Sequence, residues 1–139
     1  MRILLTLVWA IALFIFTCSV NFRLLIEHHY VHFMFNPNPD WSELLDLDLD
    51  FADSDWLLRK IGHFVGFGIL AVLASDFGKY RTAIAYSILY AAFTEVLQLF
   101  FFRGGRIYDV INDSAGILLA YILCLIFFGT SKRHKRAFN

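Results

Sequence analysis

The chain has 139 residues, of which 59% are hydrophobic and 18% are aromatic, and 12 Lys and Arg residues balance 12 Asp and Glu residues. Apolar content this high, gathered in blocks, excludes an ordinary soluble domain of this length. Zero net charge excludes a global attraction to nucleic acid, so we expect an integral membrane protein with no nucleic-acid partner.

Four apolar blocks follow one another along the chain. Each approaches the ~20 residues that a helix needs to cross about 30 Å of hydrocarbon. Helices are the expected form because lipid offers no partner to bare backbone polar groups. We therefore predict a single all-α domain over residues 1–139, an integral membrane four-helix bundle with spans of about 3–20, 56–76, 82–102 and 109–129. The first block carries no charge and no glycine, and we interpret it as an anchor helix without a functional residue.

Basic residues predict the orientation of these helices. Arg2, the link 76–81 and the tail 132–136 carry basic side chains, and the positive-inside rule assigns such segments to the cytoplasm. Both termini are then expected to be cytoplasmic. The loop between the first two helices, residues 21–55, becomes an acidic extracytoplasmic loop.

Two patterns in this loop resemble metal sites weakly. His28 and His32 are four residues apart and would share a face if the segment were helical, although an interfacial belt explains them as well. Asp46, Asp48 and Asp50 alternate as in an EF-hand loop, but the glycine and the final glutamate of that loop are missing. We assign no metal and no cofactor. We expect the leucines between these acids to rest on the outer membrane surface, with the loop covering or gating what lies beneath it.

Polar side chains interrupt the last three apolar blocks, always near their predicted outer ends. An ionisable group in a spanning helix costs roughly 2.5–3.5 kcal/mol at mid-depth, so it usually faces a partner or a water-filled pocket. Gly62, Gly66 and Gly68 allow a neighbouring helix to approach the second block closely. We predict one polar cluster under the outer surface. Its candidate ligand-binding residues are Lys60, His63, Glu95, Gln98, Arg106, Asp109 and Asp113, and its candidate catalytic residues are His63 and Glu95.

These residues also carry a family resemblance. The ordered set Lys60-x-x-His63-Phe64, Glu95-x-x-Gln98 and Gly105-Arg106-x-x-Asp109-x-x-x-Asp113-x-x-Gly116 resembles the VanZ-like family of small bacterial membrane proteins, over about residues 57–125. The resemblance implies a helical bundle in the bacterial cytoplasmic membrane and a link to low-level resistance to the glycopeptide teicoplanin. Asp113 stands where relatives tend to have Asn, and the loop lies outside the match.

Three functions are compatible with this pattern. In the first, the cluster binds the headgroup of a membrane lipid or a lipid-linked cell-wall precursor, with Lys60, Arg106 and protonated His63 contacting phosphate or carboxylate. In the second, the chain is a membrane-embedded hydrolase or transferase acting on such a precursor, with His63 and Glu95 as acid and base, or with a carboxylate pair and His holding a divalent metal. In the third, the polar groups pair with one another in a structural or assembly subunit. A homo-oligomer is compatible with each.

Overall fold

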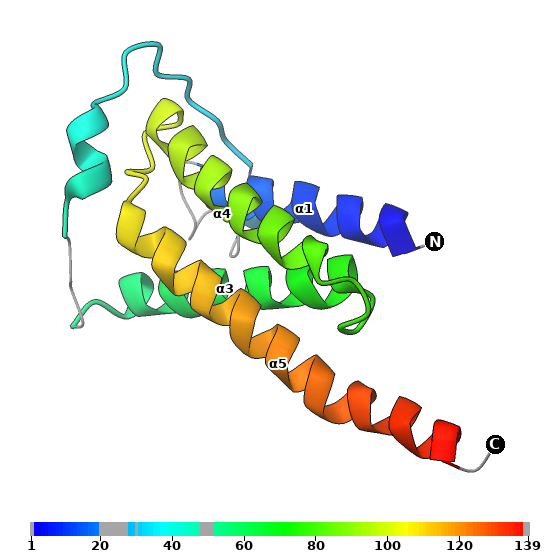
Figure 1. The fold of residues 1–139 in the computed structure, drawn as a ribbon. Coiled ribbons are helices and arrows are strands. Elements are labelled where there is room, and N and C mark those ends of the chain that lie inside the picture. Colours follow the sequence, from blue (N-terminus) through cyan, green and yellow to red (C-terminus); the bar gives the residue numbers. More distant parts are fainter. Residues whose placement is uncertain (1, 20–27, 30, 48–51, 138–139) are drawn as a thin grey trace.

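The regular secondary structure in the described part of the chain is all helical. The computed structural model describes residues 2–19, 28–29, 31–47 and 52–137, with side chains as far as residue 128. Four α-helices and one short 3-10 helix make up this part, which contains no strand (Figure 1); in chain order they are α1 (Arg2–Cys18), η1 (Trp41–Leu45), α3 (Ser54–Ser75), α4 (Thr82–Phe100) and α5 (Ile107–Ala137). The predicted all-α fold with four helices is confirmed.

Three of these helices are long and apolar enough to cross a membrane: Ser54–Ser75, Thr82–Phe100 and Ile107–Phe128. These helical segments begin and end within two residues of the predicted spans. The first helix has 17 residues and is therefore about 25 Å long at 1.5 Å per residue, a little less than the hydrocarbon thickness. Large apolar side chains are exposed along α1, α4 and α5, as expected of surfaces that face lipid.

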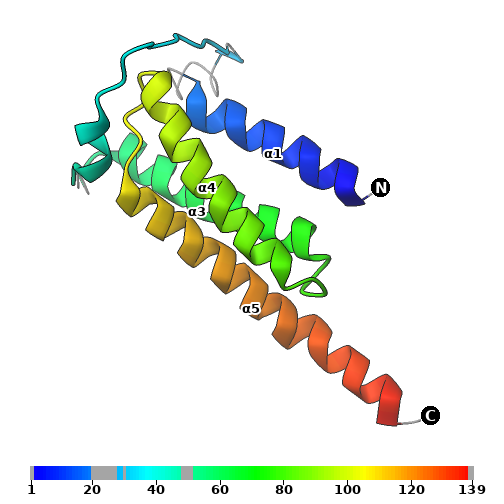
Figure 2. The same ribbon diagram turned by 45° about the horizontal axis from the view of Figure 1, so that its top comes forward.

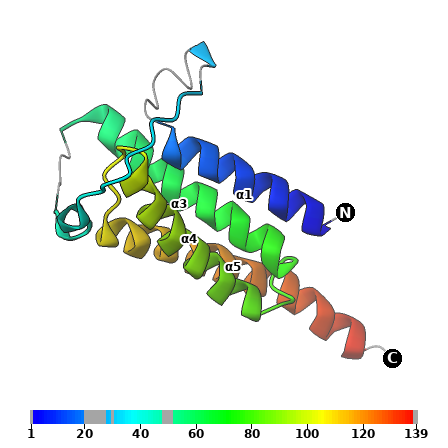
Figure 3. The same cartoon turned by 90° about the horizontal axis from the view of Figure 1, so that it is seen from above.

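The N-terminus and the link between α3 and α4 lie at the same end of the bundle. The Arg2 guanidinium lies 3.1 Å from the Asp76 carboxylate and 4.4 Å from the centre of the Tyr80 ring. Both ends of the chain also lie toward this end, with the last turns of α5 extending past the other helices (Figures 2 and 3). The basic segments used in the orientation argument thus lie toward one end of the bundle, and the side of the membrane they occupy stays a prediction.

Helix α3 is the element that holds the bundle together, because it packs against α5, α4 and α1. Its side chains Phe67, Leu70 and Ala71 join residues of the other three helices in the buried core. Trp9 of α1 donates its indole N–H to the Gly66 carbonyl oxygen at 2.9 Å. This bond ties α1 to the face of α3 that carries the small residues.

Glycines set the distance between α3 and α5. The backbone of Gly116 lies directly against the backbone of Phe64, where a Cβ atom would overlap the carbonyl group, and Gly68 packs against the Gly116 carbonyl oxygen. The close approach expected near Gly66 and Gly68 is therefore present. Gly62 takes no part in it, because a Cβ atom at that position would meet nothing within 4 Å.

The turn between α4 and α5 is covered by the 31–47 segment. The Asn36 N–H donates to the Phe100 carbonyl oxygen at 2.7 Å, and Trp41 meets the Phe100 ring edge-on with 5.9 Å between centroids. Phe33 and Phe101 pack with Phe14 of α1 in an aromatic cluster. The described part of the acidic loop is thus docked on the same end of the bundle as the polar side chains.

Candidate functional site

The most tightly paired charges of the site are Lys60 and Asp109. The Lys60 Nζ atom lies 2.5 Å and 2.6 Å from the two carboxylate oxygens of Asp109, in the first turn of α5. The same ammonium group lies over the rings of Tyr108, at 4.5 Å, and Trp56, at 5.3 Å. Lys60, one of the predicted ligand-binding residues, is thus paired with a carboxylate of a neighbouring helix.

His63 lies one turn deeper and faces two carboxylates. Its Nδ1 atom is 3.3 Å from Asp113 Oδ2 on α5 and 3.7 Å from Glu95 Oε1 on α4. Asp113 and Glu95 are almost completely buried, with exposed fractions of 0% and 1%. Three helices therefore contribute one side chain each to a single buried cluster, which we call the His63 cluster.

Glu95 is held in place by two further donors. The Gln98 amide donates to Glu95 Oε1 at 2.6 Å, and the backbone N–H of Arg106 donates to Glu95 Oε2 at 2.9 Å. The second bond requires a glycine at position 105, because the Gly105 backbone lies so close to the Glu95 carbonyl group that a Cβ atom would overlap it. The Arg-Gly-Gly-Arg turn of residues 103–106 thus brings a backbone donor onto a buried carboxylate, where an unmatched charge is costly.

All seven residues named as candidate ligand-binding positions come together at this end of the bundle. The six on the helices meet through the contacts above, and the Arg106 side chain helps to line a small polar cavity of ≈ 20 Å³ shared with Lys60, His63 and Gln98. Asn112 belongs to the cluster as well, because its amide donates to the Lys60 carbonyl oxygen at 3.1 Å and approaches Asp113 Oδ1 at 3.5 Å. Asn112 was not among the candidate residues predicted from the sequence.

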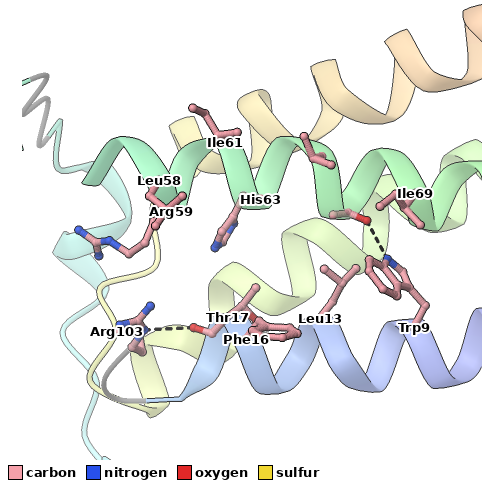
Figure 4. A pocket seen from close by; sticks show the side chains of 13 residues that line it. Trp9, Leu13, Phe16, Thr17, Leu58, Arg59, Ile61, His63, Ile69 and Arg103 are labelled. Atoms are coloured by element: carbon pink, nitrogen blue, oxygen red, sulfur yellow. Dashed lines mark hydrogen bonds between the residues drawn. The ribbon is translucent and has the colours of Figure 1, made fainter. Parts of the chain in front are cut away.

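A larger cavity of ≈ 370 Å³ lies between α1 and α3, and its wall is almost entirely apolar. We call it the α1–α3 groove; Figure 4 shows Trp9, Leu13 and Phe16 of α1 along one side and Leu58, Ile61 and Ile69 of α3 along the other. Three basic side chains gather at one end. In Figure 4 His63 points from α3 toward α1, with Arg59 and Arg103 beside it.

Arg103 is anchored at this end of the groove. Its Nε–H donates to the Thr17 carbonyl oxygen at 3.2 Å, near the end of α1 (Figure 4). Burial lowers the pKa of the Arg103 guanidinium below its usual range, and the nearby positive charge of Arg59 lowers it further. An anion held between the two guanidinium groups would offset both effects.

Sequence reasoning missed this groove because it treated the first helix as an anchor without function. Trp9, Leu13 and Thr17 do not stand out in an apolar block, and their role depends on how α1 is rotated against α3. Gly62 of α3 also lines the α1–α3 groove. In the structure Gly62 borders open space, whereas Gly66 and Gly68 pack against neighbouring helices. The sequence alone does not distinguish these two kinds of glycine.

The metal hypotheses for the loop have different outcomes. The helical pairing of His28 with His32 is wrong, because His29 has a left-handed backbone with φ of 52° and residues 31–35 are not helical. The Asp46, Asp48 and Asp50 pattern falls partly outside the described residues. Among the residues that the structure describes, the side chains able to share a metal ion are those of the His63 cluster.

Comparisons with known proteins agree with this architecture. The family model described as VanZ/LLP1 matches residues 3–128, which include α1 and the loop and so reach well beyond the expected match of 57–125. The chain is 37% identical over 130 residues to the "Uncharacterized membrane protein YwnJ" of Bacillus subtilis (strain 168), covering 92% of this chain and 90% of that protein. No solved structure matches it. With its apolar helices and a membrane protein of Bacillus as a relative, the chain is a multi-pass bacterial membrane protein, and it belongs to the VanZ/LLP1 family.

Proposed function

We propose that this protein binds an anionic, phosphate-bearing lipid of the cell envelope, such as a lipid-linked wall precursor, in the outer leaflet. The α1–α3 groove takes part of the apolar chain, and the basic end of the groove takes the headgroup. In this proposal the protein contributes to tolerance of teicoplanin-type glycopeptides, which act at the same surface.

The observation that carries the proposal is the composition of the groove. An apolar wall along ≈ 370 Å³ ends at Arg59, Arg103 and His63, so the cavity is amphipathic in the same sense as a lipid. Arginine suits this role because its planar guanidinium can bind phosphate through two N–H donors at once. Lys60 is held by Asp109, and therefore the cations that line the groove, rather than Lys60, take the headgroup.

The first test is direct lipid binding by the purified full chain in uncharged detergent, with a chelator present. Fluorescent phosphatidic acid is compared with phosphatidylcholine carrying the same label, and inorganic phosphate is added as a competitor. We expect tighter binding of phosphatidic acid and little displacement by free phosphate, because the acyl chain contributes to the affinity. Equal binding of the two lipids would refute the proposed headgroup recognition.

Variants assign the binding to the groove. The double change Arg59→Gln and Arg103→Gln is expected to weaken phosphatidic acid binding at least about tenfold, since charge-assisted hydrogen bonds contribute about 1.5–3 kcal/mol each. Gly62→Leu is expected to weaken binding of both lipids by filling the groove. Arg81→Gln is the matched control, because Arg81 is an exposed arginine at the other end of α4. An unchanged affinity in the double variant, measured on folded protein, would refute the groove as the site.

A membrane enzyme is the second candidate function, favoured by the 3.3 Å contact of His63 with Asp113, which orients the imidazole as a general base requires. Turnover of a phosphate-bearing lipid by purified protein, abolished by Glu95→Gln, would establish it.

A structural role is favoured instead by the pairing of each carboxylate in the cluster. Loss of folded protein with Asp109→Asn and with Glu95→Gln, together with unaltered glycopeptide susceptibility of cells lacking the gene, would support that role.

A further inference from the structure

The His63 cluster, which shares only His63 with the α1–α3 groove, has the composition and spacing of a metal site. One imidazole nitrogen and two carboxylate oxygens come from three different helices, and the three atoms lie within 4.8 Å of one another. His63 Nδ1 is 3.3 Å from Asp113 Oδ2 and 3.7 Å from Glu95 Oε1. These are the atoms through which His, Asp and Glu bind metals.

The separations fit one class of ion. Zinc binds His nitrogen and carboxylate oxygen at about 2.0–2.2 Å, so two ligands of a tetrahedral zinc ion lie roughly 3.3–3.6 Å apart. The two ligand separations from His63 fall at or close to that value. Calcium needs six to eight oxygen ligands and magnesium prefers water and oxygen, so a site with an imidazole nitrogen favours a transition metal.

Neighbouring groups orient the carboxylates as outer-shell partners do in metal proteins. The Arg106 backbone N–H donates to Glu95 Oε2, leaving Oε1 facing His63. The Asn112 amide approaches Asp113 Oδ1, leaving Oδ2 facing His63. Gln98 donates to Glu95 Oε1 itself, and a carboxylate oxygen with two lone pairs can accept that bond and still bind a cation.

The buried negative charge of the cluster and the cavity beside His63 also favour a bound metal ion. Asp113 and Glu95 are buried among membrane-spanning helices, where two neighbouring carboxylates repel each other and a divalent cation would neutralise both. A zinc site with three protein ligands usually takes water as its fourth ligand. The polar cavity of ≈ 20 Å³ has about the size of one water molecule and is lined by His63, but not by Glu95 or Asp113, so it gives water access to the imidazole side of the cluster.

We propose that His63, Glu95 and Asp113 bind one divalent transition-metal ion of the zinc type, with a water molecule as the fourth ligand. The competing arrangement is a cluster held by a proton on His63. Only the first arrangement binds one metal ion per chain. The metal can be tested without lipid, because Glu95 and Asp113 lie on α4 and α5 and do not line the α1–α3 groove; His63 is the residue that the cluster and the groove share.

The experiment uses the purified full chain in detergent without lipid. After treatment with a chelator and its removal, the protein is titrated with Zn²⁺, and bound metal is counted by mass spectrometry. We expect one ion per chain. Co²⁺ is added to a second sample, and we expect the intense visible absorption of a four-coordinate site. Absence of stoichiometric Zn²⁺, or a weak six-coordinate Co²⁺ spectrum, would overturn the proposal.

Isosteric variants then locate the ion. Asp113→Asn and Glu95→Gln keep the side-chain volume, and we expect each to weaken metal binding by at least about 100-fold, because outer-shell partners alone already account for 10–100-fold. The paired change His28→Gln and His32→Gln is the control, since both are exposed histidines outside the cluster. Loss of the ion in that control, or full retention in the cluster variants, would overturn the assignment. If the cluster variants do not fold, the Co²⁺ spectrum of the unaltered chain decides the question.

Discussion

The close approach of α3 and α5 at Gly116, and the open space beside Gly62, predict different effects of a Gly→Ala change at these two positions. In Gly116→Ala the new methyl group would overlap the Phe64 carbonyl oxygen and lie 2.9 Å from its carbonyl carbon and 3.1 Å from its Cα atom. Favourable carbon–carbon contacts occur at about 3.5–4.0 Å, so the two helices must separate by roughly 0.5–1 Å. In Gly62→Ala the methyl group meets nothing within 4 Å.

The magnitudes follow from this difference. Overpacking of a well-packed interface costs typically about 1–3 kcal/mol, whereas replacing glycine by alanine within a helix stabilises it by roughly 0.5–1 kcal/mol. We therefore expect Gly116→Ala to lower the free energy of unfolding by about 1–2 kcal/mol. Gly62→Ala is expected to leave it unchanged or raise it by up to about 1 kcal/mol.

The assay is unfolding in mixed micelles with increasing denaturing detergent, followed by circular dichroism and near-ultraviolet signals, for both variants and the unaltered chain. The separation of the helices in Gly116→Ala would also lengthen the Lys60–Asp109 and His63–Asp113 contacts, which cross the same interface. Equal unfolding midpoints for the two variants would show that α3 and α5 do not meet at Gly116, and the site geometry built on that contact would fall with it.

Two further predictions concern single contacts, measured by the same unfolding assay. Asp109→Asn leaves the mostly buried Lys60 ammonium without its carboxylate and is expected to cost about 3 kcal/mol, whereas the double change Lys60→Met and Asp109→Leu is expected to recover most of this loss. A double variant no more stable than Asp109→Asn would contradict the ion pair. Trp9→Phe removes the N–H bond to Gly66 and is expected to cost about 1 kcal/mol, with Trp41→Phe, at an exposed tryptophan, as the matched control. Equal effects of these two changes would contradict the packing of α1 against α3.

Much of the architecture was determined by the sequence alone. Apolar blocks of 18–21 residues are helices in lipid because no other form satisfies their backbone, so the predicted bounds of the last three helices were close to those observed. Short connections make these helices antiparallel neighbours, and depth along a helix follows from a rise of 1.5 Å per residue. Lys60, Glu95 and Asp109 could therefore be assigned to one end of the bundle before any contact was known.

Only the tertiary structure decided which groups pair with which. Residue spacing locates a side chain to within about one turn, but an ion pair depends on helix rotation and axial offset, which packing at Gly116 controls. Lys60 consequently binds Asp109, and Arg59 and Arg103 line the groove. The groove itself exists because α1 lies across the open face of Gly62, a contact between segments distant in the chain that hydropathy does not encode. The sequence thus determined the helices and their depth, and side-chain packing determined the site.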